Sequence, residues 1–491
     1  MDPNIPISAA TRCHLHDSIF VQSEIRNYKN SLICHNEVLV FQTTVIFLIM
    51  TALQRIRRIF SFLFKIIAAI LVLLLAFVFS KPLWNRYVTY PKLEKERAEL
   101  WKKYKKPENV IPHIDYKGVL HSHSYRSHDS RGVLQEIIPA AKQAKLNFIF
   151  LADHRISDQD TFPRGFQGIF DGVVVESGTE SPGPSLMVTP LRNTIIDWTK
   201  DRNEIIKSTV QKGGMVFYLH SEDNSHDWGN PDYQGMEIYN IHSDLIDEKN
   251  PLTFLINGMV NSGKYRHWGY RELFDEQTRI LSLWDSLNNH RRIVGMAAVD
   301  AHNNQSIRAR YLKNGEVEWV GSNSKTLSIN KPGWKEKWLF GKPDVAGWVF
   351  KMEFDTYFHS FNFVNTHIFG DTLSSRALKN ELVKGHAYIS FESLAEANGF
   401  QFYSTGISGN LNAIVGDSVL AKDTKALHAI SPYPVTFELF RNGKMIDKKE
   451  NSYEYRFITK SNSGNYRIAA RLKLGNELIP WVYTNPIYVY R

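Results

Sequence analysis

Cysteine is scarce in this sequence of 491 residues, which contains only Cys13 and Cys34. Because no thiol follows Met50, the rest of the chain has no disulfide framework, no thiolate nucleophile and no cysteine-ligated zinc. The excess of positive over negative charge is also small: 59 Lys and Arg against 50 Asp and Glu give a formal charge of +9, spread along the chain. This charge favours anionic partners only weakly, and no basic-aromatic cluster indicates a nucleic-acid site.

Several signatures of common enzymes are missing. The chain has no Walker A loop, no His-Glu-x-x-His, no Gly-x-Ser-x-Gly and no dinucleotide-binding fingerprint. Its 43% hydrophobic and 22% charged residues are close to globular averages, which excludes wholesale disorder. The length suits roughly three domains of about 150 residues. Because the common signatures are missing, any active site in these domains has to be of a different type.

Residues 1–58 show no sustained hydrophobic period, so we expect an unstructured segment or one that precedes the true start, with Met50 as the suspected initiator. The apolar run Ile59–Phe79 then supplies 21 residues, against about 20 needed to span a bilayer. No small-x-small cleavage site follows, so residues 59–80 are predicted to be an uncleaved transmembrane anchor rather than a signal peptide or a buried core helix. Residues 81–109 alternate Lys and Glu with apolar residues at helical spacing, which predicts a charged stalk helix.

Positive charge lies on both sides of the predicted anchor, so the charge rule gives no firm orientation. The tight cluster Arg55, Arg57 and Arg58 precedes the apolar run, and the long part of the chain follows it. We therefore expect a single-pass membrane protein whose C-terminal part is extracytoplasmic.

Residues 110–422 alternate between strand-like and helix-like patterns. Strands are predicted at 117–120, 148–151, 173–175, 215–219, 235–239 and 293–299, with helices at 133–145, 202–211 and 278–288. Repeated strand–helix units predict an α/β domain with a parallel sheet or a barrel. Residues 423–491 alternate without helices around the turn signal Asn442-Gly443, which predicts a small immunoglobulin-like β-sandwich.

Histidine and carboxylate side chains follow the predicted strands where each strand ends. In α/β barrels these strand ends meet at one mouth, so we expect the side chains to converge. Imidazole and carboxylate without thiolate suit Zn, Mn or Fe, and so many ligands suit more than one ion. A buried polar network is the alternative interpretation. The candidate ligands are His121, His123, Asp129, His154, Glu180, His220, Asp300 and His302.

The ordered motifs around these residues resemble the PHP (polymerase and histidinol phosphatase) family of metal-dependent phosphoesterases. They are His121-Ser122-His123 with the loop to Gly132, Phe150-Leu151-Ala152-Asp153-His154, Gly178-Thr179-Glu180, Leu219-His220, Gly235-Met236-Glu237 and Val299-Asp300-Ala301-His302. The resemblance covers roughly residues 110–400 and implies an irregular (β/α)7-type barrel with up to three metal ions. The segment after Leu382 also looks like the tail of membrane-associated PHP proteins.

By this resemblance, three ligand groups share the site. His121, His123, Glu180 and Asp300 would hold one ion; Glu180 would bridge to a second ion held by His220; Asp129, His154 and His302 would hold a third. The sequence departs from the family pattern at Ser185, where a further His ligand is often found. Glu237 is therefore an alternative ligand at the second position, and Glu176 an alternative bridging carboxylate.

The resemblance implies a phosphatase or phosphodiesterase that uses metal-bound hydroxide in a site of two or three divalent ions, with no protein nucleophile. Arg155 is a candidate contact for substrate phosphate, because guanidinium pairs well with phosphate oxygens. The expected substrate is a phosphorylated small molecule or a nucleotide. Two alternatives stay open: another metal-dependent hydrolase of the amidohydrolase type, and a non-catalytic membrane protein that binds a metal or ligand.

Overall fold

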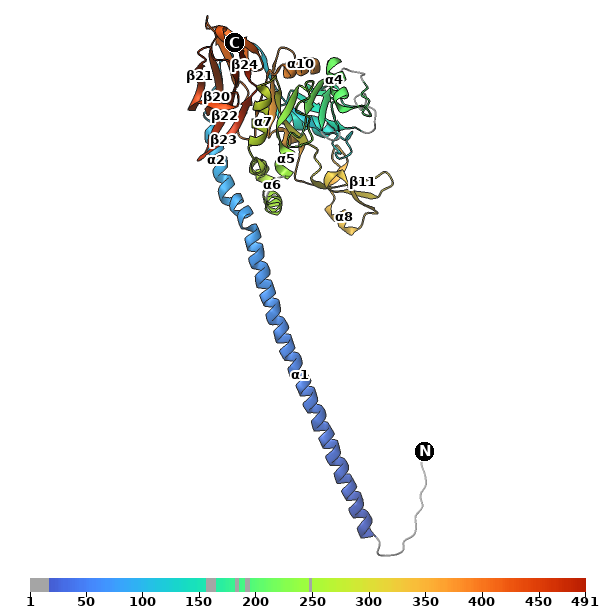
Figure 1. Cartoon of the computed structure of the whole chain (residues 1–491). Helices are drawn as coiled ribbons and strands as arrows, with labels where there is room; N and C mark the ends of the chain where they lie inside the picture. The colour runs from blue at the N-terminus through green and yellow to red at the C-terminus, as the bar shows by residue number, and fades with distance from the viewer. Residues whose placement is uncertain (1–16, 156–164, 182–184, 190–194, 247–249) are drawn as a thin grey trace. The chain divides into compact units, whose positions relative to one another are not determined.

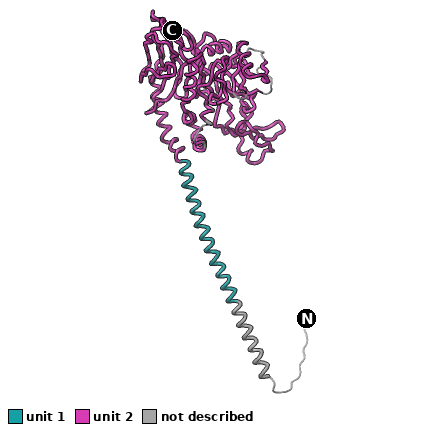
Figure 2. The backbone as a smooth tube through the Cα atoms, viewed as in Figure 1, with its two compact units in different colours: residues 1–79 teal, residues 80–491 magenta. Residues whose placement is uncertain are grey.

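The computed structural model describes residues 17–155, 165–181, 185–189, 195–246 and 250–491 (Figure 1). The chain divides into two compact units, Met1–Phe79 and Ser80–Arg491 (Figure 2). The predicted metal ligands and the predicted β-sandwich all belong to the second unit.

The first unit is dominated by α1 (Asp17–Trp84), a helix of 68 residues that extends a few residues past the unit's end. No glycine interrupts this segment, and its first proline is Pro82, so the backbone has no strong helix breaker before its last turn. Among the described residues, this is the one helix long and apolar enough to cross a membrane, and its most apolar window has a mean hydropathy of 3.0. The predicted anchor 59–79 lies within it. Residues 17–58, expected to be unstructured, are helical here.

The segment predicted as a stalk is packed into the second unit. A short π-helix, η1 (Asn85–Thr89), leads into α2 (Tyr90–Trp101). Tyr90 and Leu100 are buried in an apolar cluster with Trp268, and the Trp101 indole donates a hydrogen bond to the Leu394 carbonyl at 2.8 Å. Lys92, Lys95 and Glu99 thus lie on the outer face of a packed helix, whereas Glu94 faces inward and accepts a hydrogen bond from the Trp268 indole at 2.9 Å.

Parallel strands form the centre of the second unit. The strand β1 (Ile114–Ser122) lies between β2 (Phe148–Leu151) and β10 (Val294–Ala301), and Leu120 lies opposite both Phe150 and Ala298. Further parallel pairs join β2 to β5 (Val173–Glu176), β8 (Met215–Tyr218) to β9 (Gly235–Asn240), and β9 to β10. The predicted α/β class is confirmed.

Both faces of these strands are buried, as the continuous apolar runs predict. Val119, Ile149 and Val216 share one core cluster with α3 (Leu134–Gln143), α4 (Arg202–Gln211) and α7 (Thr278–Asn288). Their neighbours Leu120, Phe150 and Phe217 belong to a second cluster on the opposite face. The two-residue alternation of strand side chains thus fills two separate layers.

The remaining ladders run through short, irregular strands. β3 (Asp153–His154) pairs with β6 (Thr179–Glu180), β6 pairs with β7 (Leu186–Thr189), and β7 pairs with β8. β6 joins β7 directly, but Ala152 separates β2 from β3 and residues 177–178 separate β5 from β6, so the strands do not form one uninterrupted circle of ladders. A closed (β/α)7 barrel therefore stays a prediction, whereas a large mixed sheet is what the structure has.

Two parts of this unit have no counterpart in the predicted elements. One is α6 (Pro251–Leu273), which kinks at Tyr265. The other is a four-stranded antiparallel sheet that carries the small helix α8 (Trp334–Leu339). We refer to this part, residues 306–353, as the insertion sheet. Its strands are β11 (Ser306–Tyr311), β12 (Val317–Val320), β13 (Thr326–Asn330) and β14 (Trp348–Glu353).

The C-terminal strands are antiparallel and join the large sheet. The hairpin of β20 (Thr424–Arg441) and β21 (Lys444–Ile458) turns at Asn442-Gly443, where both residues have positive φ, as the turn signal predicts. β22 (Gly464–Leu474) pairs with β20 and β23 (Glu477–Thr484), and β23 pairs with β16 (Ala387–Ser390). Strand β17 (Gln401–Gly406) also pairs with β20, so this antiparallel part begins before residue 423.

Candidate metal centre

Three of the predicted ligands have left-handed backbone conformations where their strands end. The φ angles of His121, His220 and Asp300 are 59°, 48° and 42°, values that non-glycine residues rarely adopt. At His121 the register of β1 shifts against both neighbouring strands, which is the mark of a β-bulge. The sequence suggested that regular strand alternation would place His121 and His123 on one side, but the strand is irregular between them. Their ring centroids nevertheless lie 5.2 Å apart.

The first ligand group is His121, His123, Glu180 and Asp300, all buried. His121 Nε2 lies 3.2 Å from both Glu180 Oε2 and Asp300 Oδ1. His123 Nε2 lies 3.4 Å and 3.2 Å from the same two oxygens. Ligands held about 2.1 Å from a tetrahedral ion lie about 3.4 Å apart, so these spacings fit one ion between the four side chains.

The second group is His123, Asp129, His154 and His302. Asp129 Oδ2 lies 3.0 Å from His302 Nε2 and 3.3 Å from His154 Nε2. The rings of His123 and His302 stack with centroids 3.9 Å apart. Nε2 of His123 is buried and has no hydrogen-bond partner among the described residues, although it lies 3.2 Å from Asp300 Oδ1. A buried imidazole nitrogen facing carboxylates in this way fits a metal ligand.

His220 adjoins the first group through the opposite oxygen of Glu180. Its Nε2 lies 3.3 Å from Glu180 Oε1 and 3.7 Å from Asp300 Oδ2. Ser185, at the position where the family often has His, donates its hydroxyl to the same Oε1 at 2.8 Å. Glu180 thus has one oxygen toward His121 and His123 and the other toward His220, the geometry that a bridging carboxylate needs.

The two alternative carboxylates, Glu237 and Glu176, lie outside the two ligand groups. Glu237 Oε1 accepts a hydrogen bond from His121 Nδ1 at 2.6 Å, and its Oε2 accepts the His220 backbone N–H at 2.7 Å. A carboxylate on the far nitrogen of an imidazole fixes the tautomer that leaves Nε2 free for a metal. Glu237 therefore orients two predicted ligands. Glu176 instead accepts hydrogen bonds from Ser375 and from the backbone N–H of Ser177.

Charge is strongly coupled in the cluster. Burial alone would lower the pKa of His121, but Asp300 and Glu237 raise that pKa well above its ordinary value. His220 shows the same balance: burial opposes Glu180 and Glu222, which raise its pKa to about 12. Burial would raise the pKa of Glu180, but three histidines hold it well below its ordinary value. In the absence of metal, protons on the imidazoles thus compensate the carboxylates, and a bound cation would displace them.

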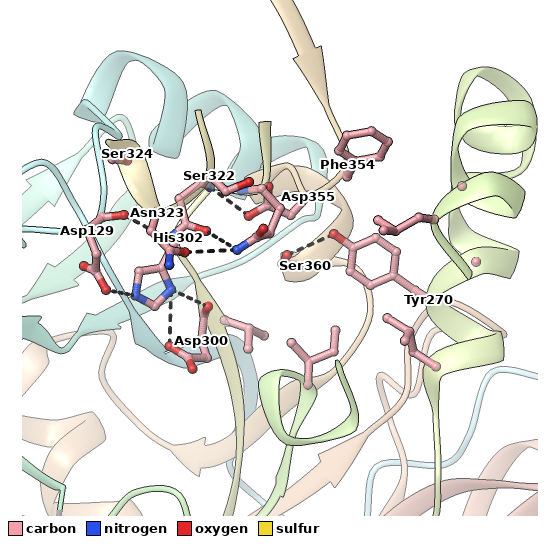
Figure 3. A pocket seen from close by; sticks show the side chains of 18 of the residues that line it. Asp129, Tyr270, Asp300, His302, Ser322, Asn323, Ser324, Phe354, Asp355 and Ser360 are labelled. Atoms are coloured by element: carbon pink, nitrogen blue, oxygen red, sulfur yellow. Dashed lines mark hydrogen bonds and ion pairs between the residues drawn. The ribbon is translucent and has the colours of Figure 1, made fainter. Parts of the chain in front are cut away.

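A cavity of about 870 Å³ opens onto this cluster. Asp129, Asp300 and His302 lie at one end of it, and Tyr270 and Phe354 lie toward the other (Figure 3). The walls include α6 and residues 322–326 of the insertion sheet. Six of the eight predicted ligands thus line a pocket large enough for an organic ligand, and His121 and His123 contact some of these six without lining it.

Some residues of the site escaped the sequence analysis. His128 lines the cavity, and its ring centroid lies 4.7 Å from that of His154. It lies in the loop between His123 and Gly132 but was not among the predicted ligands. Tyr357 donates its hydroxyl to the His123 carbonyl at 2.7 Å and so supports the loop, but no sequence pattern links the two. Arg155 is not among the residues that line the cavity, and its role as a phosphate contact stays a prediction.

No family model matches the sequence, and no curated protein matches it. One solved structure that matches is a two-domain protein from Bacteroides vulgatus described as containing a predicted PHP-like metal-dependent phosphoesterase. It is 10% identical, with a TM-score of 0.32, and the match covers 78% of this chain and 98% of that chain. The two ligand groups have the His and carboxylate composition that the sequence motifs predict. The resemblance to the PHP family therefore rests on the sequence motifs and on the composition of these two groups.

The PHP-like ligand series maps onto the geometry with one difference. The resemblance assigns His123 to the first ion alone, whereas here a nitrogen of its ring belongs to each of the two groups. The two groups are therefore contiguous, and ions held in them would be close neighbours.

Proposed function

We propose that this protein is a membrane-anchored, metal-dependent phosphoesterase. The observation that supports it best is the convergence of eight separately predicted ligands in one cluster, with N–O spacings of 3.0–3.4 Å within the two groups. Six of the eight line the inner end of one cavity. Such spacings suit ions between the side chains. We further propose that these ligands encircle the mouth of an irregular (β/α)7-type barrel.

The residues present suit two or three divalent ions of the Zn, Mn or Fe type. His121, His123, Glu180 and Asp300 would hold one ion, and Asp129, His154 and His302 another. His220 and the second oxygen of Glu180 would hold a further ion. Bound there, divalent ions would supply Lewis acidity, which lowers the pKa of water and neutralises phosphoryl oxygens.

The reaction we propose is hydrolysis of a phosphate ester. The oxygen of a water molecule bonds to phosphorus, the ester P–O bond breaks, and a proton from the water ends on the leaving oxygen to give an alcohol. Glu237 would keep one His121 proton on Nδ1, so that Nε2 is the nitrogen that gives up its proton to a bound ion. Arg131 and Lys325 line the cavity and would contact the phosphate oxygens of the substrate, because cationic donors pair well with them.

We also propose that residues 59–79 of α1 anchor the protein in a membrane, with the catalytic part outside the cytoplasm. The length and apolarity of α1 support the anchor. The test is fractionation of cells that express the full chain: it should stay with membranes after a high-salt wash and enter solution only with detergent. Recovery in the soluble fraction without detergent would contradict the anchor.

The catalytic proposal is tested by metal analysis of the purified chain and by assays with a phosphomonoester, p-nitrophenyl phosphate, and a phosphodiester, bis(p-nitrophenyl) phosphate. We expect at least two equivalents of metal and hydrolysis of one ester. Asp300→Asn should lower hydrolysis about a hundredfold or more, since it removes a charged ligand without changing side-chain size.

Asp371→Asn is the matched control, because it makes the same change on an exposed carboxylate that contacts only His113 among the ion pairs of the described residues. It should leave hydrolysis unchanged. A metal-loaded Asp300→Asn protein as active as the parent would contradict the proposed site. If the metal-loaded parent hydrolyses neither ester, the phosphoesterase proposal fails, and a non-catalytic protein that binds a metal or ligand becomes the preferred interpretation.

A further inference from the structure

The cavity changes character along its length. Its inner end is formed by predicted ligands, whereas its outer part combines apolar side chains such as Phe254, Leu255, Leu273 and Phe354 with polar ones such as Asn261 and Arg266. A phosphate group would occupy only a small part of a cavity of about 870 Å³, which is the size of pockets that hold whole organic ligands. The remainder of the ligand should therefore be apolar.

The apolar wall continues from the cavity to the surface along α6. Leu255 lines the cavity and is itself exposed, and it shares a helix face with Leu252 and Met259, which are 67% and 61% exposed. This helix is fastened where the chain enters the second unit: Arg86 Nη1 donates to the Val260 carbonyl at 2.7 Å, and Asn261 Nδ2 donates to the Pro82 carbonyl at 3.2 Å. Pro82 follows the predicted anchor by three residues.

The opposite wall of the cavity belongs to the insertion sheet, whose helix α8 exposes two indoles. Trp334 and Trp338 are 75% and 82% exposed and are four residues apart, so they share one helix face. Five exposed lysines surround them in sequence between residues 325 and 342, against one glutamate. Exposed Trp beside Lys is typical of segments that lie in a membrane interface and bind anionic lipids. In Figure 1, α6 and α8 lie toward the same end of the second unit.

We propose that the substrate is a membrane lipid with a phosphate-ester headgroup, and that α6 and α8 contact the bilayer so that the lipid enters between them. This inference rests on the proposed phosphoesterase function and names its substrate class. The lipid's apolar part would lie along Phe254 and Leu255 while its phosphate reaches the ligand cluster. Water then adds across the ester P–O bond, and the lipid alcohol leaves with the proton.

The first test compares esters that share a reacting group. The full chain, reconstituted in vesicles of phosphatidylcholine, is assayed on dioleoyl phosphatidic acid and on glycerol 3-phosphate, and likewise on dioleoyl phosphatidylglycerol and on glycerophosphoglycerol. We expect kcat/KM for the lipid of the accepted ester class to exceed that for its soluble partner by about a hundredfold or more, since remote apolar binding energy contributes to turnover. Equal or faster turnover of the soluble ester would overturn the proposal.

The second test detects the membrane contact without any turnover. In a full chain with Cys13→Ser and Cys34→Ser, Trp338→Cys provides a single labelling site on α8, and Met445→Cys provides a matched exposed site on β21. A fluorophore at position 338 should be quenched by spin-labelled lipids in the vesicle, and one at position 445 should not. No difference between the two positions would overturn the membrane contact.

The two readouts separate this inference from the proposed function. If neither member of either ester pair is hydrolysed while the probe at position 338 is quenched, the phosphoesterase proposal fails and the membrane contact holds. If a soluble ester is hydrolysed best and the probe is not quenched, the phosphoesterase proposal holds and the lipid proposal fails. Trp334→Ser with Trp338→Ser should lower the ratio of lipid to soluble-ester turnover about tenfold, because it removes both interfacial indoles.

Discussion

The two ends of strand β1 carry two buried clusters of histidine and carboxylate with different properties. At its start, Asp115 and Lys117 meet His367 and Glu392; at its end, His121 meets Glu180 and Asp300. In the first cluster both ring nitrogens of His367 face a carboxylate, at 2.8 Å and 3.3 Å, and Lys117 Nζ lies 3.4 Å from Glu392. Tyr388 and Ser390 donate further hydrogen bonds to these carboxylates.

In the second cluster several Nε2 atoms converge on the same carboxylate oxygens. Among the described residues, the groups that could hold a metal ion contain residues of this second cluster and none of the first. The comparison teaches that a count of His and carboxylate residues does not identify a site. What distinguishes a site is several lone pairs directed at one point, because a paired network already compensates its own charge.

The largest effects should come from the same substitution made at each end. His302→Gln should lower ester hydrolysis about a hundredfold or more, because it removes a predicted metal ligand. His367→Gln should cost about 3–5 kcal/mol of unfolding free energy, since it leaves buried carboxylates without their partner, yet the protein that remains folded should keep its activity. Activity and thermal unfolding of the detergent-solubilised chain decide both. An inactive but stable His367→Gln protein would contradict the comparison.

An intermediate effect is expected for Glu237, which contacts the ligands without being one in this structure. Glu237→Gln should weaken metal binding about 10–100-fold, because the carboxylate no longer holds the His121 proton on Nδ1. Titration of the metal-free protein with Zn or Mn measures the affinity, and saturating metal should restore most of the hydrolysis. Activity that excess metal cannot restore would indicate a direct catalytic role instead.

The paired cluster also predicts how stability depends on pH. Burial would lower the pKa of His367, but Asp115 and Glu392 raise it from 6.5 to about 9. The stabilisation from His367 is thus complete below pH 6.5 and is lost as the pH rises through 9. Burial would raise the pKa of Glu392, but Lys117 and His367 lower it from 4.5 to about 2, so its stabilisation is complete above pH 4.5 and is lost as the pH falls through 2.

The difference in thermal midpoint between the parent and His367→Gln should therefore shrink between pH 6.5 and pH 10. A difference that stays constant over this range would show that the imidazole of His367 is not protonated in the folded protein.

The smallest effect is expected at a third pair, on the surface. His113 Nδ1 lies 2.7 Å from Asp371 Oδ1, but the Asp371 side chain is 75% exposed. Solvent screens such a pair, so Asp371→Asn should change the unfolding free energy by less than about 1 kcal/mol. Thermal unfolding of this variant and of His367→Gln shows how much burial adds to the stabilisation by an ion pair. Similar losses of unfolding free energy in the two variants would refute the distinction between the buried and the exposed pair.

The parts that the sequence predicted well are those with strong local patterns. Apolar runs such as Phe148–Leu151 and Met215–Tyr218 became buried strands because a strand covered on both faces has no polar alternation to obscure it. His121, His220 and Asp300 were predicted as ligands because each follows such a run directly, whereas Asp129 lies in the loop that leads to Gly132. The convergence of Glu180 with His121 then follows from the meeting of parallel strand ends.

The parts that escaped prediction depend on contacts distant in sequence or on weak patterns. The bulge at His121 leaves no local signal, since non-glycine residues seldom adopt its backbone angles. Helix α6 contains Gly258, Gly263 and Gly269, which lower its helix propensity, so packing rather than local preference decides its structure. The positioning role of Glu237 depends on a contact with His121, 116 residues away in sequence.

The left-handed backbone at His121, His220 and Asp300 sets a conflict between durability and activity. Each position would be satisfied best by glycine, which adopts positive φ without a steric penalty, yet each carries a side chain that the centre needs. Strain of this kind costs of order 1–3 kcal/mol per residue and persists where the surrounding structure holds the residue in place, as it often does at active sites. Selection for heat resistance alone would therefore favour glycine at these three positions. The selected proteins would unfold at a higher temperature than the parent but would have lost its hydrolytic activity.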